Sequence, residues 1–109
     1  MAETQPKIML IVRGLKSNLT RDELEKRYKD RMPDFRKVEG LVQKYYAYDE
    51  STREWAGIYF WASEKALAAY LESDLRKSIP SAYELTDPPR IERYPIVDVL
   101  RPPRESGAA

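Results

Sequence analysis

The sequence contains neither cysteine nor histidine. Without cysteine there can be no disulfide, thiolate nucleophile, zinc–thiolate site or iron–sulfur cluster. Without histidine the chain also lacks the usual general base at neutral pH and the commonest protein ligand for metals and haem. Any catalysis must use Asp, Glu, Lys, Arg, Tyr, Asn, Ser or Thr side chains, or the reactivity of the substrate itself. We therefore expect no metal and no cofactor.

Net charge and long apolar runs are also scarce. The 109 residues include 19 basic and 18 acidic side chains, which leaves a formal charge of +1 and no bulk attraction to nucleic acid or anionic membranes. No run approaches the roughly 20 apolar residues of a membrane span, and the start "MAETQPK" is not a signal peptide. We expect a cytoplasmic protein with one domain over residues 7–101, a disordered N-terminus (1–6) and a disordered tail (102–109).

Four segments have the β-branched and aromatic composition of strands, namely residues 7–15, 41–48, 54–62 and 90–100. The turn "DEST" should join the second and third segments as a hairpin. Pro95 has no backbone N–H to donate, so the last strand should lie at a sheet edge or carry a bulge.

Two helices should alternate with these strands. Thr20 and Glu23 have the spacing of a capping box for a helix that Pro33 should kink or end. Residues 63–75 form the second helix, capped by Ser63, with a buried stripe of Ala66, Leu67, Tyr70 and Leu71. Residues 76–89 read as a loop or short helices. The order β-α-β-β-α-β predicts an α+β, ferredoxin-like domain with a four-stranded antiparallel sheet and two helices on one face.

The stretch from 43 to 61 holds seven of the twelve aromatic residues. Strand alternation divides this part of the chain between two sheet faces, and both faces are apolar or aromatic. One set is Tyr45, Ala47, Ala56, Ile58 and Phe60, and the other is Tyr46, Tyr48, Trp55, Tyr59 and Trp61. Because helices cover only one face, the other face needs a second cover, either another protomer or a nucleic acid.

RNA-recognition motifs share this topology and stack bases on aromatic residues of the first and third strands. "LIVRGL" resembles their first-strand signature, and "REWAGIYF" partly fits the third. However, Glu54 replaces a small glycine, while Gly57 and Ile11 stand where stacking aromatics are needed. Each missing stack removes roughly 1–3 kcal/mol, so a nucleic-acid partner is not expected.

The chain instead resembles the YdhR-type monooxygenase family, within the superfamily of dimeric α+β barrels that includes antibiotic-biosynthesis monooxygenases. The resemblance covers roughly residues 7 to 100 and rests on "VEGLVQKYY", "AGIYFW", "SEKALAAYLESDL", "IPSAYE" and "RIERYPI". It implies a homodimer in which two sheets pack face to face into a barrel, with a pocket between the sheet and the helices of each protomer.

The resemblance also implies oxidation of a flat aromatic, phenolic or quinol-like molecule without flavin, haem or metal. The protein would bind the ring, exclude water, promote proton loss and stabilise an oxyanion. The candidates are Lys44 and Arg93 as catalytic residues. Substrate-binding candidates are Tyr46, Trp55, Tyr59, Trp61, Tyr70 and Tyr83.

Each candidate also has a structural interpretation. Lys44 at a sheet rim could extend to water, and Arg93 could pair with Glu92 or with an acid of another strand. Tyr70 has the spacing of a core residue, and Trp55 and Trp61 suit a pocket or an interface equally. A non-catalytic ligand-binding or structural dimer remains a third alternative, because fold does not determine function.

Overall fold

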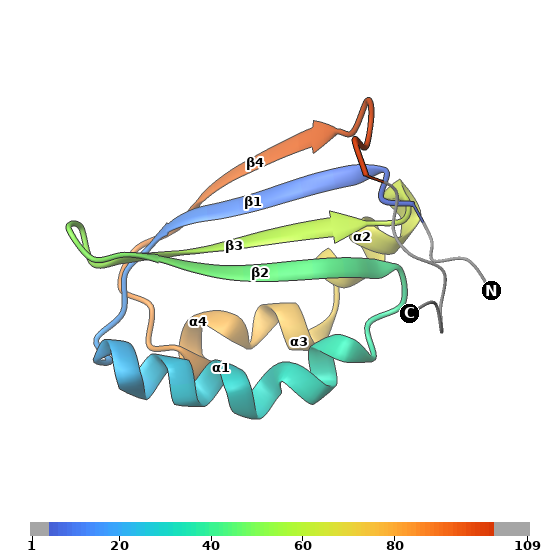
Figure 1. Cartoon of the computed structure of the whole chain (residues 1–109). Helices are drawn as coiled ribbons and strands as arrows, with labels where there is room; N and C mark the ends of the chain where they lie inside the picture. Colours follow the sequence, from blue (N-terminus) through green and yellow to red (C-terminus); the bar gives the residue numbers. More distant parts are fainter. Residues whose placement is uncertain (1–4, 102–109) are drawn as a thin grey trace, which may run out of the picture.

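Four antiparallel strands form one sheet in the computed structural model, which describes residues 5–101 (Figure 1). The sheet order is β2-β3-β1-β4, and Figure 1 shows α1, α3 and α4 below the sheet. This arrangement confirms the predicted ferredoxin-like α+β class. The expected disordered ends lie outside the described residues, except for residues 5 and 6. The strands are β1 (Ile8–Leu15), β2 (Leu41–Asp49), β3 (Glu54–Trp61) and β4 (Arg90–Pro95), and the helices are α1 (Arg21–Arg36), α2 (Glu64–Leu71), α3 (Asp74–Lys77) and α4 (Ile79–Ala82).

Helix α1 begins at the predicted capping box but runs further than expected. The Thr20 hydroxyl accepts a hydrogen bond from the Glu23 amide, and the Glu23 carboxylate accepts one from the Thr20 amide. Of the two outcomes predicted for Pro33, a kink or an end, the end is wrong, because the helix continues to Arg36. Phe35, only 4% exposed, anchors the last turn in the core, which offsets the single backbone hydrogen bond that proline removes.

The second helix is shorter than predicted, because α2 ends at Leu71 and a separate turn, α3, follows. The Ser73 hydroxyl accepts a hydrogen bond from the Arg76 amide and donates one to the Tyr70 carbonyl. This side chain therefore ends one helix and caps the next. The last strand is also shorter than predicted and stops at Pro95, but it does lie at an edge of the sheet, next to β1 alone.

Two irregularities in strand pairing decide which side chains face the helices. The register between β2 and β3 shifts between Leu41 and Gln43. In a regular strand, residues three positions apart lie on opposite faces, but this shift lets Leu41 and Lys44 both point toward the helices. The register between β1 and β3 shifts between Val12 and Leu15, where Gly14 has a φ of 74°. This shift turns Leu15 inward together with Val12.

The core lies between the sheet and the helices in two clusters. The larger one surrounds Trp61 and Leu67, which are fully buried, and includes Phe35, Tyr59 and Tyr70. The smaller cluster contains Leu24, Trp55 and Tyr83. Between them the packing leaves a cavity.

Candidate active site

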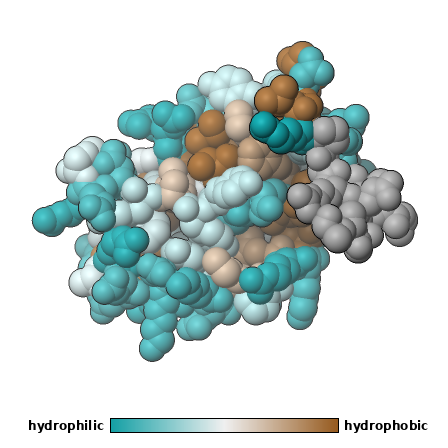
Figure 2. Space-filling model, in the orientation of Figure 1, coloured by the Kyte–Doolittle hydropathy of each residue, from teal (hydrophilic) through white to brown (hydrophobic). Residues whose placement is uncertain are grey.

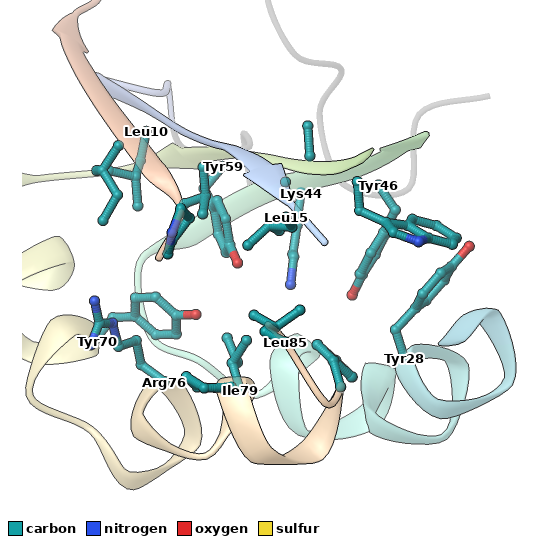
Figure 3. A pocket seen from close by; sticks show the side chains of 18 of the residues that line it. Leu10, Leu15, Tyr28, Lys44, Tyr46, Tyr59, Tyr70, Arg76, Ile79 and Leu85 are labelled. Atoms are coloured by element: carbon teal, nitrogen blue, oxygen red, sulfur yellow. The ribbon is translucent and has the colours of Figure 1, made fainter. Parts of the chain in front are cut away.

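The cavity between the sheet and the helices has a volume of about 140 Å³ and a largely apolar lining. Figure 3 shows Leu10, Leu15 and Tyr59 on the sheet side, with Tyr28, Ile79 and Leu85 opposite them. Among residues 5–101 the lining contains no carboxylate. Its polar side chains are Tyr28, Lys44, Tyr46, Tyr59, Tyr70, Arg76 and Tyr83.

Lys44 enters the cavity from β2, and its amino group points into the space between Tyr46 and Tyr59 (Figure 3). Nζ lies 3.7 Å from the centroid of the Phe35 ring, 4.5 Å from that of Tyr46 and 4.6 Å from that of Tyr59. The Lys44 amine is therefore directed toward these rings rather than out to water, and the residue as a whole is partly buried. Although β2 is an edge strand, α1 passes beneath it and supplies Phe35.

Burial lowers the pKa of Lys44 to about 7, and the positive charge of Arg31 contributes to the shift. A buried ammonium loses hydration, and no carboxylate of the described lining replaces it. The faces of the three rings attract the ammonium form and offset part of the cost of burial. This lowered pKa makes the uncharged amine far more accessible at neutral pH than it is for an exposed lysine.

The tyrosines around the amine remain protonated well above neutral pH. Burial raises the pKa of Tyr46, Tyr59 and Tyr83, and it raises the pKa of Tyr70 to about 12. The hydroxyls of Tyr70 and Tyr83 are buried and form no hydrogen bond with the described residues. Such hydroxyls can donate hydrogen bonds to a ligand oxygen.

Arg31 ties α1 to the short helices that close the cavity. Its guanidinium donates hydrogen bonds to the Ser78 hydroxyl (2.6 Å) and the Leu75 carbonyl (3.3 Å), and it lies over the Tyr83 ring. Arg31 was not among the site residues predicted from the sequence. A signal existed, because Leu24, Tyr28, Arg31 and Phe35 have the spacing of one buried helix face.

The structure gathers Lys44, Tyr46, Trp55, Tyr59, Tyr70 and Tyr83 around the cavity. Trp61 and Arg93 lie elsewhere. Trp61 is fully buried behind the cavity, where its ring stacks on Tyr59. Arg93 is half exposed on β4 and forms a salt bridge with Glu64, at the start of α2, rather than with Glu92.

Among residues 5–101 no helix lies over the other face of the sheet. Its side chains include Ile11 on β1, Tyr45 on β2, and Ile58 and Phe60 on β3. Tyr45 is 55% exposed. Hydrophobic residues are visible in the upper part of Figure 2, where the strands lie, whereas the helical part below is mostly hydrophilic. The central positions of this face carry isoleucines, which cannot stack bases.

No helix within residues 5–101 is long and apolar enough to cross a membrane. No group of three or more His, Cys, Asp or Glu side chains in that part of the chain could hold a metal ion.

Similar solved structures establish the fold class, that of antibiotic-biosynthesis-monooxygenase-like proteins. A protein of unknown function from Nitrosomonas europaea aligns with a TM-score of 0.72 at 18% identity, covering 90% of this chain and 96% of that one. A putative antibiotic biosynthesis monooxygenase from Caulobacter crescentus gives 0.71 at 20% identity, covering 88% and 94%. SnoaB, a cofactor-independent oxygenase from Streptomyces nogalater, gives 0.69 at 13% identity, covering 87% and 97%.

The sequence itself identifies the family. Residues 11–86 match the family described as "Putative mono-oxygenase ydhR", and the chain belongs to this family. The resemblance seen in the sequence is thereby confirmed. No curated protein matches the chain significantly.

Proposed function

We propose that this protein is a cofactor-independent monooxygenase that acts on a small phenolic or hydroquinone ring beside Lys44. The observation that carries the proposal is the Lys44 amine, which lies against three aromatic rings in an apolar cavity while the residue as a whole is partly buried. Membership of the mono-oxygenase family supports the reaction class.

The size of the cavity supports a ligand with one ring. An apolar cavity of about 150 Å³ engineered into another protein binds benzene, and the cavity here has a volume of about 140 Å³. A fused three-ring quinol would require the walls to move apart. We therefore infer that the substrate is a single aromatic ring with one or two hydroxyl groups.

Lys44 acts as the general base in this proposal. An uncharged amine can take the proton of a phenolic hydroxyl, and the resulting ammonium then pairs with the phenolate. The poorly hydrated cavity strengthens that ion pair. The hydroxyls of Tyr70 and Tyr83, which stay protonated, donate hydrogen bonds to the developing oxyanion.

Ionisation makes the ring electron-rich enough to reduce dioxygen. For a hydroquinone the balanced reaction is hydroquinone plus O₂ giving hydroxyquinone plus water. One oxygen atom enters the ring, the other leaves as water, and the substrate supplies all four electrons. The protein contributes binding, proton removal and exclusion of water.

Oxygen consumption by the protein with methylhydroquinone tests this reaction directly. Simple autoxidation gives quinone and hydrogen peroxide, so added catalase returns half of the oxygen. Monooxygenation gives water, so catalase returns none. We expect the wild type to accelerate peroxide-free oxygen uptake and Lys44→Met to abolish the acceleration. Equal rates in the two proteins would contradict the proposal.

The same cavity also suits a protein that binds the ring without oxidising it. This second candidate is favoured by the scarcity of catalytic groups, since Lys44 is the one described lining residue with a pKa near neutrality. A ligand-dependent rise in melting temperature without oxygen uptake would identify a binding protein.

We further propose that the uncovered sheet face pairs with a second copy of the chain to form a dimeric α+β barrel. The partly exposed Ile58 and Phe60 on this face support the pairing. Ile58→Arg should convert a dimer into a monomer in sedimentation experiments at micromolar concentration, because an unpaired charge would be buried. A wild type that sediments as a monomer would contradict the pairing.

A further inference from the structure

The Lys44 amine is a potential nucleophile as well as a base. Its lone pair is available at neutral pH, and Nζ points into the cavity (Figure 3), where no carboxylate of the described lining faces it. Amines with these properties form covalent bonds with carbonyl compounds. The monooxygenase reaction does not use this reactivity.

We propose that Lys44 forms an imine with aromatic aldehydes of one ring, so that the cavity is a carbonyl-binding site as well as a phenol site. The aldehyde carbon gains a bond to Nζ, giving a carbinolamine. The carbinolamine then loses its oxygen as water, which carries away two protons, both derived from the amine. No oxidant or reductant is needed, and the reaction requires no oxygen.

The surroundings of Nζ favour this condensation. The hydroxyls of Tyr70 and Tyr83 can donate hydrogen bonds to the carbonyl oxygen as it becomes a hydroxyl and leaves. The apolar walls hold the aldehyde ring and limit the water that would hydrolyse the imine.

The charged and titratable groups near the amine leave it free to react. The positive charge of Arg31 favours the uncharged amine, and the phenols stay protonated. Among residues 5–101 no carboxylate lines the cavity to hold Lys44 as an ammonium ion. The groups are Arg31 from α1, Tyr46 from β2, Tyr59 from β3, Tyr70 from α2, Arg76 from α3 and Tyr83 after α4.

Reductive trapping with 2-hydroxybenzaldehyde and cyanoborohydride at pH 7, without oxygen, tests the proposal. Peptide mapping by mass spectrometry would follow labelling at Lys44 and at Lys65, an exposed lysine on α2. An ordinary lysine is uncharged in about one molecule in a few thousand at this pH. The lower basicity of Lys44 reduces its intrinsic reactivity, so we expect labelling on the order of fiftyfold faster than at Lys65.

Two controls make the test specific. Lys44→Met should remove the fast adduct, whereas Lys65→Met should retain it. A three-ring aldehyde, 9-anthraldehyde, should not label Lys44 faster than Lys65, because it exceeds the cavity. Labelling of Lys44 no faster than Lys65, or equally fast with both aldehydes, would overturn the proposal. Since oxygen is excluded, failure here is independent of the oxygen-uptake result.

Discussion

Replacing Lys44 with methionine should make the protein more stable and remove a specific pH dependence. Methionine has a similar length and no charge, so it fills the same space without the cost of burying an ammonium. In the wild type the unfolded chain binds the Lys44 proton more tightly than the folded chain does. Stability should therefore rise with pH between about 7 and 10.5, the folded and unfolded pKa values of Lys44.

The magnitude follows from the change in the pKa of Lys44 from 10.5 to about 7. At about 1.36 kcal/mol per unit, the full penalty below pH 7 is roughly 5 kcal/mol, reduced by the attraction of the three ring faces. Between pH 6 and pH 9, Lys44 should raise the free energy of unfolding by up to about 2.5 kcal/mol. At pH 6 the Lys44→Met protein should be more stable than the wild type by about 2–4 kcal/mol.

Urea denaturation of three proteins at pH 6 and pH 9 measures this effect. Lys65→Met is the matched control, because Lys65 is exposed on α2 and its replacement should leave the pH dependence of the wild type unchanged. If wild type and Lys44→Met gain the same free energy between pH 6 and pH 9, then the pKa of Lys44 is not lowered in the folded protein. The proposed roles as base and nucleophile would then fail together.

Other substitutions test the fold and the boundaries of the site. Gly40 has a φ of 81°, and an added Cβ would lie 2.3 Å from the Cβ of Ala66; Gly40→Ala should cost more than about 3 kcal/mol in urea denaturation. Adding Ala66→Gly should relieve the clash but leave about 1–2 kcal/mol of backbone strain at position 40. Full recovery of the wild-type stability in the double variant would disprove that strain. Gly57→Ala places a methyl 3.0 Å from the Tyr59 ring inside the cavity. It should weaken methylhydroquinone binding about tenfold in calorimetry. Unchanged binding would show that the ligand binds outside this cavity. Arg93→Met should leave turnover unchanged and stability within about 1 kcal/mol, whereas a large loss of turnover would restore the catalytic role first considered for Arg93.

Local chemical signals in the sequence were sufficient to predict the fold. The Thr20–Glu23 capping box, the Ser63 cap and the hairpin after Asp49 each appear at or near the predicted position. Helix ends were less predictable where tertiary contacts intervene. Burial of the Phe35 ring stabilises the turn of α1 that follows Pro33, and local helix propensity does not predict this contact.

The candidate site was only partly predictable, because side-chain orientation in a strand depends on register. The shift in register between Leu41 and Gln43 turns Lys44 inward, and no residue in that segment predicts such a shift. For the same reason the sequence could not separate Trp55, which lines the cavity, from Trp61, which lies behind it. The sequence also did not indicate that Arg93, on an edge strand, reaches a helix acid, Glu64.

The central claim is that Lys44 removes a proton from a phenol bound in the cavity. The most direct test is the ultraviolet difference spectrum of a bound nitrophenol, measured at a pH below its own pKa, in the wild type and in Lys44→Met. We expect the wild type to bind the phenolate, with its red-shifted absorption band, and Lys44→Met to bind the neutral phenol. A neutral phenol bound by both proteins, or a phenolate bound by both, would contradict the assignment of Lys44 as the base.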